Sequence, residues 1–300
     1  MGAIDYWCNA FTPDRRALWD AAIAAQGLEI KVRRDAADGF AEPAAMLARM
    51  DELGVDTLLL PCAEVPGHAG PFAYERYAAR PEEARALAAA HPGRIAALWS
   101  FDPSGGGAAV RRASEALAEP GFVGLHLHTH SFDRGFDHRD LYPFYALAAE
   151  RGVPVVMQAG ASGGLMPSEC GRPIGIDRPA LYFPELRFVL SHTGWPWVEE
   201  AIAMAGKHRN VYLGTATFPP HRWPEGLVRF LAGPGRGKTL FGTGFPVAGH
   251  RQVLARLAAL GLEEAARQAL LEGAARAVFT RLRALEAHLR PAGARAARTS

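Results

Sequence analysis

Four histidines of this chain stand where their side chains could do chemistry. His126, His128 and His130 alternate with other residues, and His192 follows an apolar run. Because alternate residues of a strand point to the same face, we expect the first three to share one face of a strand and its exit, with His130 beyond the strand itself. An imidazole can bind a metal ion or exchange a proton near neutral pH.

These histidines allow three interpretations. They could hold a metal ion, because imidazole is a common zinc ligand. They could act as acid–base and oxyanion-binding groups without a metal. They could also be structural side chains that are hydrogen-bonded in the core. The three cysteines show no CxxC spacing, which argues against a thiolate zinc site or a disulfide framework.

The elements that must position these residues alternate along the chain. Short β-rich runs are separated by amphipathic stretches rich in Ala, Leu and Arg. We expect strands at 3–8, 55–61, 94–100, 121–128, 153–158, 187–192, 210–214 and 238–243. We expect helices near 42–53, 73–90, 107–118, 140–151, 197–206, 222–232 and 249–259, with two more near 262–272 and 274–288. This order predicts an α/β fold, a (β/α)8 TIM barrel with extra C-terminal helices. A doubly wound open sheet is the alternative.

The domain organisation is simple. We expect one barrel domain over residues 1–289 and a disordered Ala/Arg/Gly tail over residues 290–300. The stretches 8–41 and 159–186 are longer than usual loops after a strand. In a barrel these loops surround the active site, so we expect them to form lids or substrate walls.

The bulk properties exclude several classes of partner. A formal net charge of +2 gives no indication of binding to nucleic acid or acidic membranes. No apolar run approaches the roughly 18 residues of a membrane span, and the start shows no signal-peptide pattern. We expect a cytoplasmic protein with a small-molecule substrate and no nucleic-acid or membrane partner. A homodimer is expected because closed symmetric dimers are the commonest oligomers.

Further segments carry a family resemblance. They are residues 50–56, 121–124, 152–155, 183–194, 240–243 and 274–276. In order and spacing they resemble the amidohydrolase-related family, which includes metal-dependent decarboxylases, hydratases and lactonases. The resemblance covers most of the chain and implies a TIM barrel with its pocket at the carboxyl ends of the strands.

The resemblance also implies a metal site. The family uses His-x-His on strand one, a histidine on strand five, often one on strand six, and an aspartate on strand eight. The corresponding positions here are Trp7 and Asn9, Gln158, His192 and Gly244. Of these only His192 is the family residue. Trp and Gly offer no metal donor, and Asn and Gln are poor ligands for zinc, so we expect no metal at this position.

We therefore expect a hydrolase-like or decarboxylase-like enzyme that acts on a small carbonyl, lactone or carboxylate substrate without a cofactor. His192 and His128 would be general acid–base groups, assisted by His126. One alternative is a metalloenzyme with zinc at a relocated site formed by these three histidines. The other is a non-catalytic ligand-binding protein.

The remaining predicted site residues would bind the substrate. Trp7 offers a flat stacking face and one N–H donor, and the amides of Asn9 and Gln158 offer both donors and acceptors. Arg172, in the long loop after strand five, could hold a substrate carboxylate bidentately.

Overall fold

The computed structural model describes residues 2–9, 17, 42–62, 81–162 and 166–287. Most of the predicted wall over 8–41 and the predicted tail over 290–300 lie outside these ranges. Within the described residues no helix is long and apolar enough to cross a membrane.

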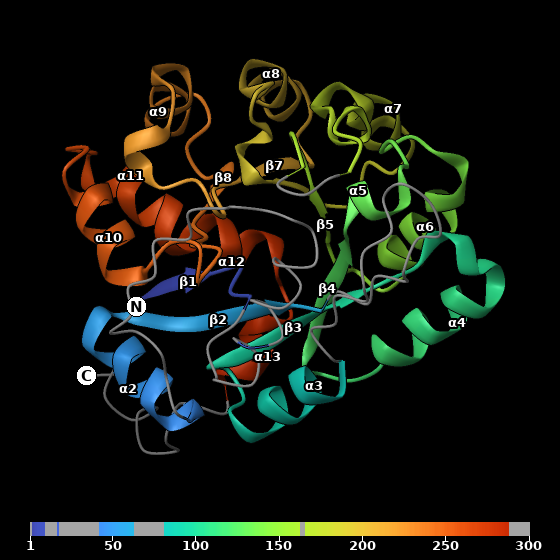
Figure 1. The fold of residues 1–300 in the computed structure, drawn as a ribbon, viewed down its shortest axis with the longest axis horizontal. Coiled ribbons are helices and arrows are strands. Elements are labelled where there is room, and N and C mark those ends of the chain that lie inside the picture. The colour runs from blue at the N-terminus through green and yellow to red at the C-terminus, as the bar shows by residue number, and fades with distance from the viewer. Residues whose placement is uncertain (1, 10–16, 18–41, 63–80, 163–165, 288–300) are drawn as a thin grey trace, which may run out of the picture.

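Eight parallel strands form one sheet in the order of the sequence, from β1 to β8 (Figure 1). They are β1 Ala3–Asp5, β2 Val55–Pro61, β3 Ile95–Ser100, β4 Phe122–Leu127, β5 Val155–Gln158, β6 Phe188–Ser191, β7 Val211–Gly214 and β8 Thr239–Leu240. Every predicted strand is present; β2 has its predicted bounds, and the others differ from theirs mainly at their ends.

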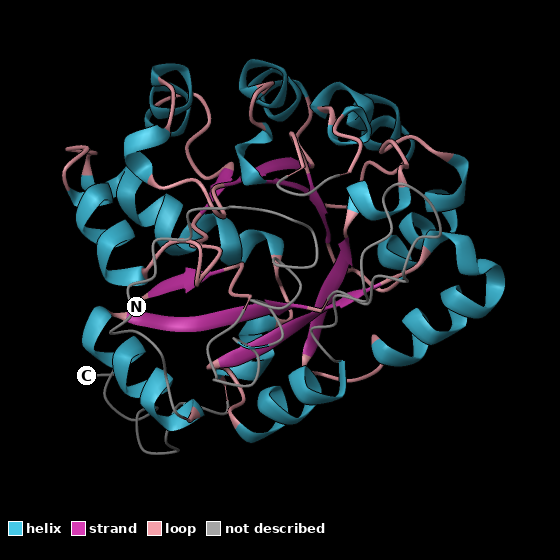
Figure 2. Cartoon of the chain, viewed as in Figure 1, coloured by secondary structure: helices cyan, strands magenta, loops and turns pink. Residues whose placement is uncertain are grey.

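Helices surround this sheet (Figure 2). They are α2 Pro43–Leu53, α3 Pro81–Ala90, α4 Gly106–Ala116, α5 Thr129–Phe132, α6 Tyr142–Glu150, α7 Asp177–Tyr182, α8 Val198–Lys207, α9 Glu225–Ala232, α10 His250–Ala258, α11 Glu264–Gln268, α12 Ala274–Val278 and α13 Leu282–Glu286. This alternation of parallel strands and helices confirms the TIM barrel and its extra C-terminal helices.

The barrel closes between the segments that follow β1 and β8. The backbone N–H of Tyr6 donates to the carbonyl of Phe241 at 3.1 Å, and that of Gly244 donates to the carbonyl of Trp7 at 2.9 Å. Cys8 and Phe245 form an isolated parallel bridge. The first strand is therefore held against the last one at its carboxyl end, where a barrel carries its active site.

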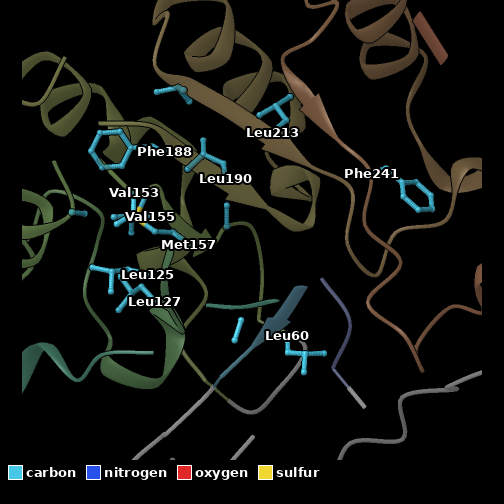
Figure 3. Close-up of a cluster of buried hydrophobic side chains, with 14 of the residues drawn as sticks. Leu60, Leu125, Leu127, Val153, Val155, Met157, Phe188, Leu190, Leu213 and Phe241 are labelled. Atoms are coloured by element: carbon cyan, nitrogen blue, oxygen red, sulfur yellow. The ribbon is translucent and has the colours of Figure 1, made fainter. Parts of the chain in front are cut away.

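The core has two layers. The first fills the space between the strands and the outer helices, and Figure 3 shows part of it, with Leu125, Val155 and Phe188 on neighbouring strands. The burial of these apolar side chains is the main stabilising contribution to such a fold.

The second layer fills the barrel interior. Ile4, Leu59 and Val156 pack there with Phe279 and Leu282 from the C-terminal helices. Figure 1 shows α12 and α13 close behind the strands, inside the ring of the other helices. These helices cover the amino-terminal end of the barrel.

An arginine fixes this cover to the strands. The guanidinium of Arg281 donates to the carbonyls of Leu117 at 2.7 Å and Phe122 at 3.1 Å, at the beginning of β4. The interior is therefore closed at the end opposite to the expected site.

Candidate active site

The chain bends directly after β1, and the bend determines which side chains enter the barrel. The strand ends at Asp5, and the carboxylate of Asp5 accepts a hydrogen bond from the backbone N–H of Trp7 at 3.0 Å. Both Tyr6 and Trp7 therefore join the interior cluster. The prediction of a strand over 3–8 was too long, because this side chain competes with the strand for a backbone donor.

Trp7 lies between two histidines at the carboxyl end of the barrel. Its ring meets that of His126 edge-on at a centroid distance of 4.8 Å and that of His192 at 5.0 Å. The indole N–H donates to the side-chain oxygen of Asn9 at 2.8 Å, and the amide of Asn9 donates to the carbonyl of Gly244 at 3.1 Å. The aligned positions thus converge, and the indole ring occupies the space between the imidazoles.

Gln158 belongs to the same end of the barrel. It is the last residue of β5, and in the strand register it pairs with Ser191, the residue before His192. The structure therefore brings every family metal-site position to the carboxyl ends of the strands.

The three clustered histidines lie on two elements rather than on one strand face. His126 is in β4, His128 directly precedes α5, and His130 lies inside α5. Ring centroids are 6.4 Å apart for His126 and His128, and 6.3 Å apart for His128 and His130. His130 lies beyond the strand, as predicted, because the chain turns into a helix at Thr129, and His128 also lies past the end of β4.

Two of these imidazoles have a defined tautomer. Nδ1 of His126 lies 2.9 Å from the carbonyl oxygen of Cys62, and Nε2 of His130 lies 2.9 Å from that of Gly160. A carbonyl oxygen only accepts, so each of these nitrogens carries the proton. The other nitrogens, Nε2 of His126 and Nδ1 of His130, are buried lone pairs without a partner among the described residues.

His192 directly follows β6 and has an unusual backbone conformation, with φ at 63°. Its Nδ1 lies 2.8 Å from the hydroxyl of Ser191, which in turn lies 2.8 Å from the hydroxyl of Tyr6. The tyrosine oxygen also accepts from the backbone N–H of Ala216 at 3.4 Å. A chain of hydrogen bonds therefore runs from inside the barrel to His192. On the other side of the site, His128 bonds through Nδ1 to the hydroxyl of Ser131.

Burial keeps these imidazoles uncharged. It lowers the pKa of His126 to about 4 and, together with the smaller repulsion from His130 and His126, that of His192 to about 3. Burial also lowers the pKa of His130, and burial with the other histidines holds that of His128 well below its usual range. At neutral pH the site is thus a group of neutral imidazoles.

The residues present do not fit the family metal. Gly244 has φ at 66°, and a Cβ added there would lie 2.5 Å from Cγ2 and 2.7 Å from the backbone nitrogen of Thr217. The family aspartate therefore has no room in this backbone conformation. Among the described residues, no three His, Cys, Asp or Glu side chains form a group that could hold a metal ion. The alternative of a relocated site at His126, His128 and His192 gains no support from this geometry.

Arg172 lies outside this cluster, on an exposed surface. Its guanidinium donates to the carboxylate of Glu200 at 2.8 and 3.0 Å and to that of Glu169 at 3.1 Å. Its predicted contact with a substrate carboxylate stays a prediction, and these ion pairs do not favour it.

The buried carboxylate of Asp5 joins the segment that carries Trp7 to the segment after β8. Asp5 accepts from the hydroxyl of Thr243 at 2.5 Å, from the backbone N–H of the same residue at 3.1 Å, and from Nε2 of His250 at 2.8 Å. Sequence reasoning missed His250, because one histidine at the beginning of a helix carries no signal of a partner 245 positions away. It also missed Tyr6 and Ser191, whose neighbours Trp7 and His192 were the residues that the family pattern marked.

Solved structures of low identity share the fold. An uncharacterised TIM-barrel protein from Bordetella bronchiseptica has a TM-score of 0.73 at 20% identity, over 94% of this chain and 99% of that one. A dihydroxybenzoic acid decarboxylase from Polaromonas, solved with manganese and the inhibitor 2-nitroresorcinol, has a TM-score of 0.67 at 17% identity, over 93% and 97% of the two chains. A 4-oxalomesaconate hydratase from Rhodopseudomonas palustris has a TM-score of 0.63 at 16% identity, over 96% and 98%.

Sequence comparison adds the family to the fold. No curated protein matches the chain. The amidohydrolase family profile matches residues 4–281, which is nearly the whole chain, so this protein belongs to the amidohydrolase family.

Proposed function

We propose that this amidohydrolase-family enzyme acts on a small carboxylated or lactone substrate, as a lyase or a hydrolase, without a metal ion at the family position. His192, His128 and His126 would supply acid–base chemistry. The substrate site would be lined by Trp7, Asn9 and Gln158.

The main support for this proposal is the position of the Trp7 ring. Trp7 stands between His126 and His192, at centroid distances of 4.8 and 5.0 Å. At this position the family has a metal-binding histidine, and an indole offers no metal donor. A ring here instead gives a substrate a flat apolar surface with imidazoles on two sides.

The electrostatics favour an anionic substrate. The site is a cluster of neutral imidazoles whose pKa values are lowered by burial. A nearby negative charge raises the pKa of an imidazole, so a bound carboxylate would draw a proton onto the cluster. The protonated imidazole would then be a general acid that forms only with the substrate in place.

This acid–base role suits two reaction types. In a decarboxylation the carbon–carbon bond breaks, carbon dioxide leaves, and the acid delivers the proton that takes its place. In lactone hydrolysis a neutral imidazole takes a proton from the attacking water, and the proton returns to the leaving oxygen. The decarboxylase and hydratase among the structural neighbours make carboxylated compounds the first substrates to examine.

Metal content and turnover test the proposal together. We would measure the bound metals of untagged protein by elemental analysis, then assay chelator-treated protein against a panel of hydroxylated benzoates, unsaturated dicarboxylates and lactones. We expect at least one substrate to be turned over without added metal. His192→Gln should lower that rate by about 10²-fold or more, the range typical of a lost acid–base group.

A matched control separates the role of His192 from loss of any histidine. His138 lies at the surface beside Asp140, away from the cluster, so His138→Gln should keep the wild-type rate. Turnover that appears only after a divalent metal is added would overturn the proposal, as would an unchanged rate in His192→Gln.

A further inference from the structure

The hydrogen bonds beneath His192 have a direction. Tyr6 and Ser191 are fully buried, and their hydroxyls and Nδ1 of His192 follow one another at 2.8 Å steps. A hydroxyl can donate one hydrogen bond and accept others. Each buried hydroxyl proton therefore needs an acceptor, and this need sets the direction of the bonds.

The backbone determines the first bond. The N–H of Ala216 donates to the Tyr6 oxygen at 3.4 Å, so it cannot accept the tyrosine proton. Among the described partners of this hydroxyl, Ser191 Oγ is the acceptor that remains. Burial raises the pKa of Tyr6, so the phenol keeps its proton to donate.

The same step repeats at Ser191. Its oxygen accepts from Tyr6, and among the described partners of this hydroxyl Nδ1 of His192 is the acceptor that remains for the serine proton. Nδ1 then accepts, so the proton of the neutral imidazole lies on Nε2. If Nδ1 instead donated to Ser191, the buried hydroxyl proton of Ser191 or of Tyr6 would have no acceptor among the described residues, which disfavours that arrangement by about tenfold or more.

The barrel holds Tyr6 closely in this place. A Cβ added to Gly214 of β7 would collide with the Tyr6 hydroxyl, and one added to Gly242 would collide with its ring. Glycine at these two positions gives the ring its space, so the ring packs directly against the backbone of β7 and of the segment after β8.

We propose that Tyr6 and Ser191 are positioning residues that hold neutral His192 with its proton on Nε2, so that His192 donates a hydrogen bond to an oxygen of the substrate. On the other side of Trp7, Nε2 of His126 is a lone pair, because its Nδ1 donates to Cys62. The site would then present one imidazole donor and one imidazole acceptor. The contact with substrate rests on the proposed function, whereas the tautomer is a property of the free protein.

The tautomer can be measured without a substrate. In protein labelled with ¹⁵N-histidine, long-range ¹H–¹⁵N spectra at pH 7 distinguish a protonated ring nitrogen from a bare one. His192→Gln identifies the signal of His192 among the 11 histidines. We expect the wild-type protein to show Nε2 protonated and Nδ1 bare.

Variants test the cause of this preference. Tyr6→Phe removes the bond that orients the Ser191 hydroxyl, and Ser191→Ala removes the donor to Nδ1, so in each variant a measurable fraction of His192 should carry its proton on Nδ1. Ser191→Thr keeps the hydroxyl and should keep the wild-type signal. The control is Tyr145→Phe, because Tyr145 is equally buried but donates to the carbonyl of Phe136.

Two results would overturn the proposal: a wild-type His192 with its proton on Nδ1, or signals that are unchanged in Tyr6→Phe and Ser191→Ala alike. If Ser191→Ala does not fold, the His192 tautomer in Tyr6→Phe and Ser191→Thr still tests the proposal. A failure to find turnover would count against the proposed function, but it would not change the result of the tautomer measurement.

Discussion

Asp5 and His250 are 245 positions apart in the sequence, yet the carboxylate of one lies 2.8 Å from Nε2 of the other in the core. The same carboxylate bonds to Thr243 through its hydroxyl and its backbone N–H, and to the backbone N–H of Trp7. One side chain therefore joins the first strand of the barrel to the segment after the last strand. It also sets where the chain turns to bring Trp7 into the site.

Asp5→Asn should destabilise the protein strongly. The two oxygens of the Asp5 carboxylate accept from four donors. The asparagine side chain has the same shape but only one oxygen that can accept. Breaking a buried charged network of this kind costs about 3–5 kcal/mol. Urea unfolding would measure the loss. Asp51→Asn is the control, since Asp51 is 67% exposed in its pair with Arg94 and should cost about 1 kcal/mol or less. Equal losses in both variants would show that the network contributes little.

Gly244→Ala tests whether the site backbone can accept the family side chain. Gly244 and Gly261 have nearly the same positive φ, at 66° and 64°, but a Cβ at Gly261 meets nothing within 4 Å. Both variants should lose the roughly 1–2 kcal/mol of the left-handed conformation. Gly244→Ala should lose a further 1–3 kcal/mol, on the order expected for overpacking against Thr217. Equal unfolding free energies would contradict this, and would mean that Thr217 moves away without cost.

Stability should fall as the pH falls from about 6.5 to about 4. The folded-state pKa is about 4 for His126 and about 3 for His192, below the roughly 6.5 of an unfolded chain. In this window the unfolded state binds more protons, so unfolding becomes easier with added acid. Between these two pKa values, each buried histidine lowers the free energy of unfolding by about 1.4 kcal/mol for each unit that the pH falls.

The free energy of unfolding measured in urea at several pH values checks this dependence. His126→Asn should reduce the dependence of the unfolding free energy on pH by the contribution of one protonation site. A wild-type stability that stays level between pH 6.5 and 4.5 would mean that these histidines are not buried in solution.

Cys170 should not react as a nucleophile. Burial, with a smaller effect of Asp133, raises the pKa of its thiol to about 12, and the thiol lies 3.2 Å from the carbonyl of Pro167. Cys8 and Cys62 are also buried. Native protein at pH 8 should thus react with a disulfide reagent far more slowly than urea-unfolded protein, in which all three thiols should react. Rapid reaction of one thiol in the native protein would show that a cysteine opens to solvent.

The sequence predicted the architecture because local patterns control it. Residues 55–61 were expected as a strand and form β2 with the same bounds. The apolar run there fills both faces of a parallel strand, and such a run can be recognised without its partners. The convergence of Trp7, Asn9 and His192 could also be expected, since the order of strands in a barrel fixes which carboxyl ends lie together.

The sequence did not predict the details that decide the chemistry. The alternation rule places Tyr6 and Trp7 on opposite faces, but the carboxylate of Asp5 bends the strand and turns both inward. The bond between Tyr6 and Ser191 joins residues 185 positions apart, and no pattern in either segment indicates it. Such pairs depend on the exact residue at which each strand ends, and residue propensities do not predict strand ends to within one residue.

The C-terminal helices give the barrel a floor, since Phe279 and Leu282 fill its amino-terminal end. If the proposed function holds, substrate should enter and product should leave at the carboxyl end, where His192 lies, so that bound product would exclude the next substrate molecule.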